Sequence, residues 1–413
     1  MNNFKRVNKC RICGSSSLVD FLNLGEHPPS DAFLTKQQLS KPEPKYPLEV
    51  CFCESCNLVQ LRQEVSPDIL FKDNYPYMTS ISKSMQSHVK NLVTSATEGF
   101  NLKKGSLVVD VGSNDGTLLE YFQDLKMNVL GVDPSNIAEI ANDRGVETLK
   151  EYFSSEIAKI ILNKYGSAQL ITGLNVFAHI GDLHDFLKGI NIVLDKNGVL
   201  ILEFPYLIDL IEKVEFDTIY HEHLSYFSIK PLTVLFGLFN MEIFDIIRTS
   251  VHGGSIRIFV KKLNSKHITT SKSKEMLALE KEEKLDSIKT YHNFEKRVQK
   301  LKIDLVSLLK ELKLQGKVIA GDGAPAKGNT LLNYCEIGTD ILDYIVEMSP
   351  LKHNLYTPGT HIPIYPINKI YSDKPDYLLI LPWNIKKDII QQQSKFAKNG
   401  GKFIVPVPRP EVY

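Results

Sequence analysis

The stretch from Tyr220 to His223 brings a phenol, two imidazoles and a carboxylate into four consecutive residues. Such groups serve as acids, bases and hydrogen-bond donors, and imidazole titrates near neutral pH. The residue types allow three interpretations: a metal cluster, a polar surface turn, or an acid–base set that removes a proton from carbon. On a strand, His221 and His223 would share a face and Glu222 would point away, so a third metal ligand is not evident.

A second cluster of reactive side chains lies near the N-terminus, where five of the six cysteines occur within the first 56 residues. Two C-x-x-C pairs supply four thiolates, the closed tetrahedral set typical of structural zinc rather than of a catalytic metal. Cys51 is an alternative to Cys53, because alternate residues of a strand point to the same face. The sequence predicts a structural Zn²⁺ site with the ligands Cys10, Cys13, Cys53 and Cys56.

A glycine-rich turn after an apolar strand indicates a cofactor site. Gly112 and Gly116 permit a tight turn and close approach of a ligand, and Asp133 ends the next strand, where an acid binds ribose hydroxyls. A dinucleotide requires G-x-G-x-x-G, and Asp115 would repel its pyrophosphate. A carboxylate suits the cationic groups of S-adenosylmethionine, so this methyl donor is favoured over NAD. The predicted cofactor-binding residues are Asp110, Gly112, Asn114, Asp115, Gly116, Asp133 and Asn175.

Alternating strand and helix patterns from residue 105 onward predict an α/β fold with a parallel, doubly wound sheet. A degenerate repeat follows, because VVDVGSNDGTLL parallels VIAGDGAPAKGNTLL and VLGVDP parallels YIVEMSP. Two facing Rossmann-like domains would leave a substrate cleft between them. The expected organisation is a zinc-binding module (1–65), a connector (66–100), a methyltransferase domain (101–264), a helical linker (265–315) and a second Rossmann-like domain (316–413).

Composition narrows the class of protein. The 413 residues carry a net charge of +1, without the basic excess that nucleic-acid binding uses. No apolar leader and no run of transmembrane length is present. We therefore expect a soluble, cytoplasmic enzyme without a nucleic-acid or membrane partner. The sequence does not set its oligomeric state.

Several motifs occur in an order that resembles one enzyme family. They are the C-R-x-C knuckle, D-V-G-S-N-D-G, G-V-D-P, E-F-P-Y, Y-H-E-H-L-S-Y-F-S, H-G-G-S-x-R and G-A-P-A-K-G-N-T-L-L. Together they resemble the nucleotide-sugar C-methyltransferases that build branched deoxysugars, over almost the whole chain. The resemblance implies a zinc module, an S-adenosylmethionine domain, and a dTDP- or GDP-linked 4-keto-6-deoxyhexose between the last two domains. It also implies methylation at C3 of that sugar.

Methylation at carbon needs a base near the C3 proton and a donor near the C4 oxygen, where the enolate charge develops. His223 is the expected base, Glu222 would orient it or hold charge nearby, and Tyr220 would donate to the enolate oxygen or a sugar hydroxyl. The resemblance adds His179 and a tyrosine of the connector. For that tyrosine Tyr75 and Tyr77 are both open, and Tyr77 is favoured.

The expected substrate-binding residues lie in two further motifs. In GDGAPAKGNT, Lys327, Asn329 and Thr330 would hold the diphosphate, and in HGGSIR, Ser255 and Arg257 would contact the sugar nucleotide. Arg257 could equally pair within a strand. Trp383 lies at the end of an expected strand, where stacking on a base and ordinary packing are both open.

Three alternative functions share parts of this pattern. An O-methyltransferase acting on the same nucleotide sugar would use the same cofactor motifs. A nicotinamide oxidoreductase would require NAD(P) at the glycine turn. A zinc-knuckle methyltransferase acting on nucleic acid would require a basic, aromatic surface, which the near-zero net charge disfavours.

Overall fold

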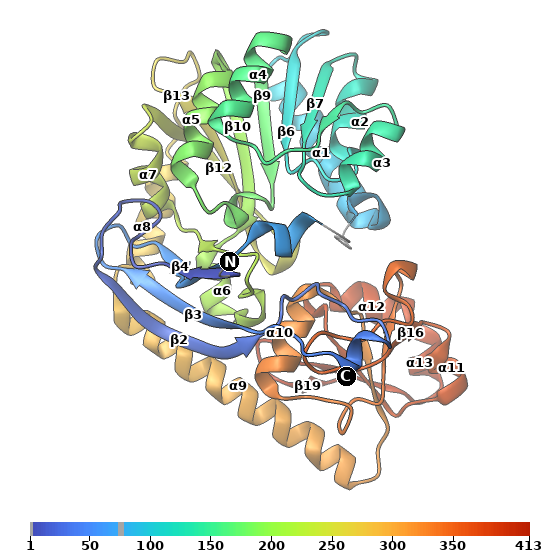
Figure 1. The fold of residues 1–413 in the computed structure, drawn as a ribbon. Helices are drawn as coiled ribbons and strands as arrows, with labels where there is room; N and C mark the ends of the chain where they lie inside the picture. The colour runs from blue at the N-terminus through green and yellow to red at the C-terminus, as the bar shows by residue number, and fades with distance from the viewer. Residues whose placement is uncertain (1–2, 73–77) are drawn as a thin grey trace.

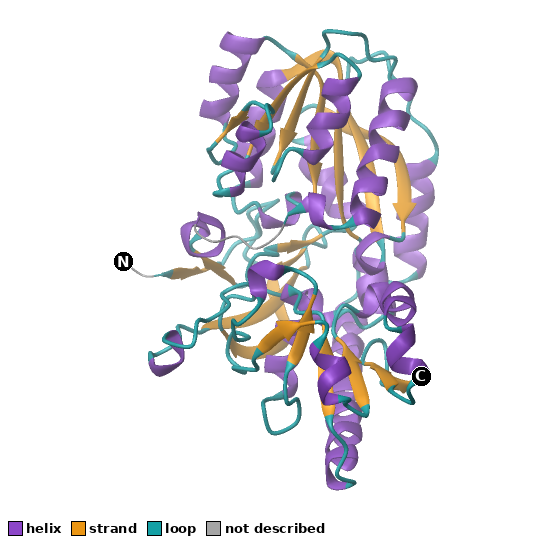
Figure 2. Ribbon diagram, turned by 90° about the vertical axis from the view of Figure 1, so that its right-hand side faces the viewer, coloured by secondary structure: helices purple, strands orange, loops and turns teal. Residues whose placement is uncertain are grey.

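The structure, a computed structural model, describes residues 3–72 and 78–413. Figure 1 shows a large sheet at the top, a small sheet in the middle and a third sheet below. Figure 2, turned by 90°, shows helices on both sides of the upper sheet. These layers confirm the predicted α/β class.

The upper sheet has the strand order β12-β13-β10-β9-β6-β7-β8. Its first strand, β6, lies near the centre, and the chain winds outward from it in both directions, as in a doubly wound fold. Among these strands β13 runs antiparallel to both of its neighbours. The bounds are β6 (Leu107–Val111), β7 (Asn128–Val132), β8 (Thr148–Leu149), β9 (Ala168–Leu174), β10 (Leu194–Pro205), β12 (Met241–Thr249) and β13 (Ser255–Lys262).

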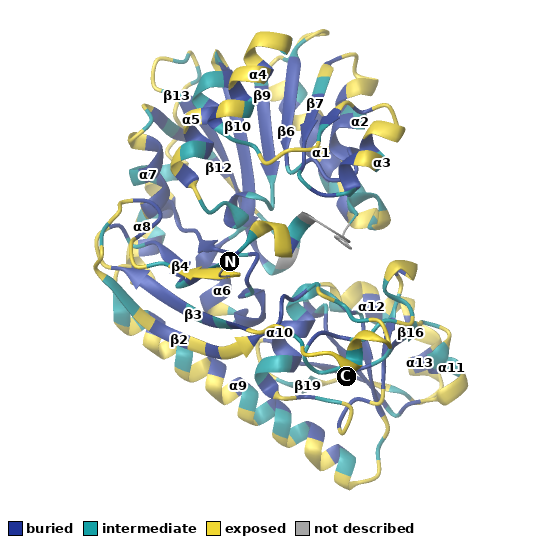
Figure 3. Ribbon diagram, viewed as in Figure 1, coloured by how far each residue is buried: buried dark blue, intermediate teal, exposed yellow. Residues whose placement is uncertain are grey.

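Both faces of the upper sheet are covered, and its strands are buried (Figure 3). Neighbouring strand residues point to opposite faces, so Val108 and Val109 belong to different cores. The core of Val108 includes α1 (Lys83–Gly99) and α2 (Thr117–Asp124), and that of Val109 includes α4 (Ser155–Tyr165) and α5 (Leu183–Val193). The short helix α3 (Ile137–Asp143) joins β7 to β8.

The small middle sheet combines segments that are far apart in the sequence. Its strands are β2 (Leu18–His27), β3 (Tyr46–Cys53), β4 (Val59–Leu61) and β11 (Ser225–Tyr226), in the order β11-β4-β3-β2. A separate ladder pairs β1 (Phe4–Arg6) with β5 (Gln63–Val65). Strand β11 follows the YHEH stretch directly and pairs with β4 of the N-terminal module. The candidate catalytic segment is therefore attached to a sheet of another module.

The lower sheet repeats the order of the upper one, with β14 near its centre: β16-β15-β14-β17-β18-β19. The acid after each second strand makes matching contacts. Asp133 accepts hydrogen bonds from the backbone N–H groups of Asn114 and Ser135. Glu347 accepts them from Ala324 and Ser349. The strands are β14 (Ile319–Asp322), β15 (Ile345–Glu347), β16 (Ile364–Pro366), β17 (Tyr377–Ile380), β18 (Lys402–Val405) and β19 (Glu411–Val412).

The long helix α9 (Ile288–Leu314) runs from the middle sheet to the lower one (Figure 1). Its Tyr291 ring lies 5.0 Å from Phe21 and 4.7 Å from Phe52, measured between centroids, so its apolar side packs on the N-terminal module. In the described part of the chain, no helix is long and apolar enough to cross a membrane. The other helices are α6 (Leu207–Glu212), α7 (Ile229–Gly237), α8 (Lys272–Glu282), α10 (Ala326–Cys335), α11 (Lys369–Asp373), α12 (Lys386–Gln392) and α13 (Ser394–Lys398).

Candidate active site

A cavity of about 600 Å³ lies where the upper sheet, the N-terminal module and the lower domain meet. The carboxyl ends of β6, β7 and β9 form one wall, the usual ligand position in an open α/β sheet. The segment after Thr218 and the start of α10 form the facing walls. One cavity therefore joins the cofactor-type strand ends to the candidate acid–base residues, which include His179, Tyr220 and His223.

The cofactor-type wall carries most of the predicted residues. Gly112 has φ +72°, and a Cβ there would lie 2.8 Å from a Val176 methyl carbon, so the tight turn requires glycine. Asp110 is buried and accepts a hydrogen bond from Thr172 Oγ1 at 2.6 Å. Burial raises the pKa of Asp110 to about 7. Asn175 lines the cavity, and its buried Oδ1 has no hydrogen-bond partner among the described residues, which suits an acceptor for a bound ligand.

Asp115 and Gly116 shape this turn instead of facing the cavity. The Asp115 carboxylate accepts hydrogen bonds from Ser80 N and Thr117 Oγ1 and lies 3.5 Å from Arg144 Nη1. Its charge is thus compensated by protein, which differs from the expected contact with the cationic methyl donor. Gly116 has φ +77° at the start of α2.

Among the residues that the structure describes, the ring of His223 makes hydrogen bonds through both of its nitrogens. Its Nδ1 lies 2.7 Å from the Thr218 carbonyl oxygen, and its Nε2 lies 2.9 Å from the Tyr220 hydroxyl. A carbonyl can only accept, so we assign the proton to Nδ1 and the lone pair to Nε2, which accepts from Tyr220. In a neutral imidazole of this tautomer Nε2 is the basic nitrogen, and both His223 and its partner Tyr220 line the cavity. Thr218, and not Glu222, orients the His223 ring.

His179 stacks on His223 with ring centroids 5.0 Å apart and an interplanar angle of 24°. Burial lowers the pKa of His179 to about 4, so this imidazole is neutral at physiological pH. Its Nε2 is buried and, within the described ranges, has no hydrogen-bond partner. A polar nitrogen of this kind at a cavity wall is available to a ligand.

The other two YHEH side chains point away from the cavity. His221 is buried, with Nε2 3.2 Å from the carbonyl oxygens of Tyr46 and Pro47, and burial lowers its pKa to about 4. Glu222 receives a hydrogen bond from Ser30 Oγ, 3.2 Å from each carboxyl oxygen. Burial, aided by the nearby Asp31 carboxylate, raises the pKa of Glu222 to about 8. Glu222 is therefore predominantly protonated at neutral pH.

Of the predicted substrate-binding residues, the structure places Lys327 at the cavity wall. Tyr75 and Tyr77 lie outside the described residues. Lys327 lines the cavity, but its Nζ donates to Asn384 Oδ1 at 3.0 Å. The other four predicted substrate residues do not line it. They are engaged in packing or structural contacts: Asn329, Thr330, Ser255 and Arg257.

The structural contacts of these four residues have clear physical reasons. Asn329 Nδ2 donates to the Ser30 carbonyl at 2.7 Å, which ties α10 to the N-terminal module. Arg257 on β13 pairs with Glu203 on the adjacent β10 at 2.7 Å, the strand pairing left open by the sequence. Ser255 Oγ donates to the Val251 carbonyl at 2.9 Å. Thr330 is buried inside α10.

Several charged residues at the cavity wall escaped the sequence analysis, among them Asp31 and Lys352. Asp31 comes from the N-terminal module, and Lys352 comes from the lower domain. Lys352 Nζ donates to the Ala324 carbonyl at 2.8 Å and lies 4.7 Å from the Phe33 ring centroid. Neither residue belongs to a motif with recognisable spacing, so only the tertiary structure identifies them.

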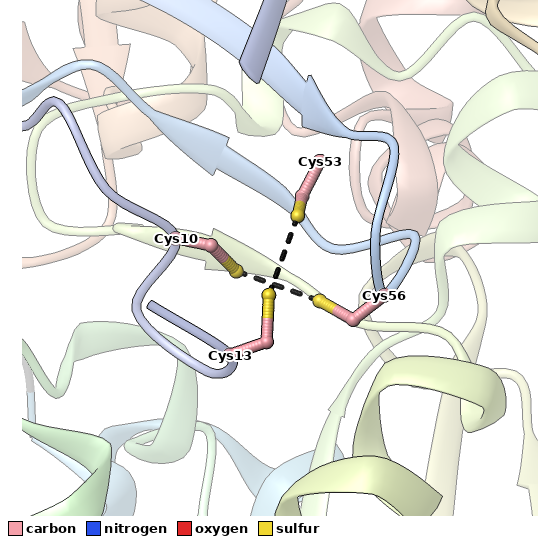
Figure 4. A group of neighbouring side chains, drawn as sticks. All are labelled: Cys10, Cys13, Cys53 and Cys56. Carbon is pink, nitrogen blue, oxygen red and sulfur yellow. Dashed lines mark hydrogen bonds between the residues drawn. The ribbon is translucent and has the colours of Figure 1, made fainter. Parts of the chain in front are cut away.

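The four knuckle cysteines converge on one point (Figure 4). The Sγ atoms of Cys10 and Cys56 are 3.4 Å apart, those of Cys13 and Cys53 are 3.6 Å apart, and all four lie within 4.8 Å of one another. Zn–S bonds of about 2.3 Å in a tetrahedron place sulfurs about 3.8 Å apart, so this set fits zinc. Cys51 lies outside the cluster, with its Sγ 3.5 Å from the Gln60 carbonyl.

Fold and site together define a class I methyltransferase domain combined with a four-cysteine metal module. Family models match in the same order: a zinc binding domain at residues 10–71, a methyltransferase domain at 85–245 and a C-methyltransferase C-terminal domain at 250–408. The C-methyltransferase NovU of Streptomyces niveus is 37% identical over 407 residues, which span 98% of this chain and 97% of that protein. The chain belongs to the family of S-adenosylmethionine-dependent C-methyltransferases with a zinc-binding N-terminal module.

Solved structures of methyltransferases match less than half of this chain. A SAM-dependent methyltransferase from Anabaena variabilis has a TM-score of 0.35 at 17% identity and covers 43% of this chain and 85% of its own. Magnesium protoporphyrin IX methyltransferase (ChlM) from Synechocystis has a TM-score of 0.34 at 17% identity and covers 43% and 82%.

Replacing a knuckle cysteine should remove the metal. We expect Cys56→Ser to lose most of the bound zinc, because three thiolates and a weaker hydroxyl no longer form the closed site. Cys51→Ser is the matched control and should retain about one zinc per chain, since Cys51 lies outside the cluster. Metal analysis of the purified variants measures this directly. Equal zinc loss in both variants would show that Cys51 is a ligand.

Replacing Glu222 with Gln should stabilise the fold at alkaline pH. The raised pKa of about 8 means that the folded chain keeps a proton that the unfolded chain releases near its usual value of 4.5. The contribution of protonated Glu222 to the unfolding free energy is therefore complete below about pH 4.5, and it is lost as the pH rises from there towards 8. We expect Glu222→Gln to add about 1–3 kcal/mol of unfolding free energy near pH 9 and little near pH 4.

Thermal and denaturant unfolding at several pH values would measure this effect. The control is Glu98→Gln, a substitution at an exposed acid of α1, which should change the unfolding free energy little at any pH. A Glu222→Gln effect that does not grow with pH would show that Glu222 is ionised in the folded protein.

Proposed function

We propose that this C-methyltransferase acts on a nucleotide-linked 4-keto-deoxysugar and adds a methyl group to C3. The observation that carries the proposal is the Tyr220–His223 pair, whose basic Nε2 lies on the same cavity as the cofactor-type strand ends. Carbon methylation requires a base beside the methyl donor, and this geometry provides one. The motif resemblance to nucleotide-sugar C-methyltransferases supplies the substrate class.

The cavity residues fit both ligands. At the cofactor wall, Asp133 would accept from ribose hydroxyls, and the free Asn175 Oδ1 would accept from a donor group. S-adenosylmethionine supplies an electrophilic methyl group when it is bound. On the facing wall, Lys327 and Lys352 add positive charge, which suits the diphosphate of a dTDP- or GDP-linked sugar.

Proton abstraction can be assigned to named atoms. His223 Nε2 takes the C3 proton, and the electrons of the C–H bond pass into an enolate conjugated with the C4 ketone. The Tyr220 hydroxyl donates a hydrogen bond to Nε2 and would turn to donate to the enolate oxygen when substrate is bound. With S-adenosylmethionine held at the cofactor wall, C3 would form a bond to its methyl carbon as the S–CH₃ bond breaks. The C4 ketone would be regenerated, and His223 would retain the C3 proton.

Neutral neighbours keep His223 basic. His179 is stacked on it and is uncharged because of burial, so it does not repel the imidazolium that forms on proton transfer. The Thr218 carbonyl accepts from Nδ1–H and stabilises that cation. Glu222 influences His223 indirectly, because its hydrogen bond with Ser30 helps to hold the YHEH segment in its conformation.

The test is methyl transfer from labelled S-adenosylmethionine to a panel of dTDP- and GDP-linked 4-keto-deoxysugars. We expect NMR of the product to show the label on C3. A label on oxygen would favour an O-methyltransferase and contradict the proposal. Failure of every panel member would remove the substrate class but leave the C-methyltransferase family assignment in place.

His223→Ala should abolish transfer while leaving the cofactor bound. Loss of a general base costs about 10²–10⁴-fold in rate, so we expect a fall in kcat of at least about a hundredfold. The affinity for S-adenosylmethionine, measured by calorimetry, should stay within about twofold, because the cofactor strand ends are untouched. His292→Ala on the exposed side of α9 is the control. Near-normal turnover of His223→Ala would eliminate it as the base.

A further inference from the structure

We propose that Asp217 and Trp383 form an interdomain latch that positions the catalytic His223, an inference that rests on the proposed function. Trp383 Nε1 donates to Asp217 Oδ2 at 2.6 Å across the interface between the lower domain and the catalytic segment. Both side chains are buried, Asp217 completely and Trp383 at 6% exposure. The sequence allowed either stacking on a base or ordinary packing for Trp383. The hydrogen bond to Asp217 gives Trp383 a third role, as a positioning residue.

The latch acts on the residue that orients the base. Asp217 lies in the turn η5 (Phe216–Thr218), and the carbonyl of its neighbour Thr218 accepts from His223 Nδ1 at 2.7 Å. The turn has its own short-range hydrogen bonds: the Thr218 N–H and hydroxyl donate to the Glu215 carbonyl, and the Ile219 N–H donates to the Phe216 carbonyl. Its place relative to the cavity is set from the lower domain, where Phe216 also packs 5.2 Å from the Tyr334 ring.

The latch also contacts the part of the cavity wall that the start of α10 forms, where the diphosphate is proposed to bind. Lys327 lines the cavity, and its Nζ lies 4.9 Å from the centroid of the Trp383 ring. Burial raises the pKa of Asp217 to about 6, and the Lys327 ammonium opposes this rise, so the two groups interact electrostatically. Asp217 Oδ1 has no hydrogen-bond partner among the described residues, which leaves the Trp383 bond as the main side-chain contact of this carboxylate.

This arrangement links the two halves of the reaction. The lower domain holds Lys327 and Trp383, and the upper domain provides the cofactor strand ends. The base lies between them on a segment that each domain contacts. If the domains were displaced, Thr218 would move with η5 and the His223 ring would turn away from the C3 proton. Asp217 and Trp383 are therefore positioning residues that act through Thr218, and they need not touch the substrate.

The test compares Asp217→Leu, Trp383→Phe and the conservative Asp217→Asn on the full chain. Asparagine keeps an oxygen acceptor of the same reach, whereas leucine and phenylalanine remove one partner of the bond. A misplacement of about 1 Å in an active site can cost about 100-fold. We expect kcat per cofactor site to fall about 30- to 100-fold in Asp217→Leu and Trp383→Phe, and at most about threefold in Asp217→Asn. KM should change little, about threefold at most.

Two readouts separate positioning from a general loss of stability. The first is exchange of the C3 proton with deuterium in the presence of S-adenosylhomocysteine, which reports proton abstraction without methyl transfer and should fall in parallel with kcat. The second is the indole N–H resonance, which needs no assignment because the chain contains one tryptophan. It should shift upfield and exchange faster in Asp217→Leu but not in Asp217→Asn. The double variant should be no slower than either single variant.

The outcomes are decisive in each direction. Wild-type kcat in Asp217→Leu and Trp383→Phe, together with a shifted indole resonance in Asp217→Leu, would overturn the proposal. A rise in KM at constant kcat would overturn it too, since Trp383 would then be a binding residue. If the leucine variant does not fold, Trp383→Phe carries the same test, because it keeps an aromatic ring. The indole measurement requires no substrate, so failure of the latch and failure of the substrate class are distinguishable.

Discussion

The pairing of β11 with β4 is the constraint on which the active site depends. Ser225 and Tyr226 pair with Gln60 and Val59, and the Leu61 N–H donates to the Leu224 carbonyl at 3.0 Å. The YHEH residues immediately precede this strand, so they cannot move without breaking a ladder of the zinc-binding module. Strand β4 in turn begins just after the second cysteine knuckle. The cysteine cluster, far away in the sequence, thus holds in place the segment that carries the proposed base, His223.

Arg11 strengthens this connection from the other knuckle. It lies between Cys10 and Cys13, and its guanidinium donates to the Leu61 carbonyl at 2.9 Å and approaches Glu64 Oε2 at 3.3 Å. Glu64 lies on the cavity wall. Both knuckles are therefore connected to β4. An ordered cysteine cluster orders β4, and β4 in turn orders β11 through their backbone hydrogen bonds. Each such hydrogen bond contributes about 1 kcal/mol to stability. Together the bonds hold the segment in a single position.

The sequence predicted the features that local spacing encodes. The zinc ligands follow from two C-x-x-C pairs, and the doubled α/β pattern follows from strand–helix alternation. Features that depend on tertiary contacts could not be predicted from the sequence. Cys51 and Cys53 are alternate residues of β3, so position along the strand decides which of them joins the cluster: Cys53 ends the strand and begins the second knuckle. Arg257 was ambiguous because its partner, Glu203, lies on another strand, and Asp31 at the cavity wall belongs to no motif. Asp115 was predicted to bind the cationic methyl donor, and its contact with Arg144, 29 residues away in sequence, could not be read from local spacing.

The most direct test of this account is amide hydrogen exchange of residues 220–226 in the zinc-loaded protein and after chelation. The account predicts strong protection of Leu224–Tyr226 with zinc, and loss of it together with that of β4 when the metal is removed, while β6 and β9 of the upper sheet stay protected. Protection of the YHEH segment that persists after complete zinc loss and unfolding of β4 would contradict it, because the segment would then be held by the upper domain alone.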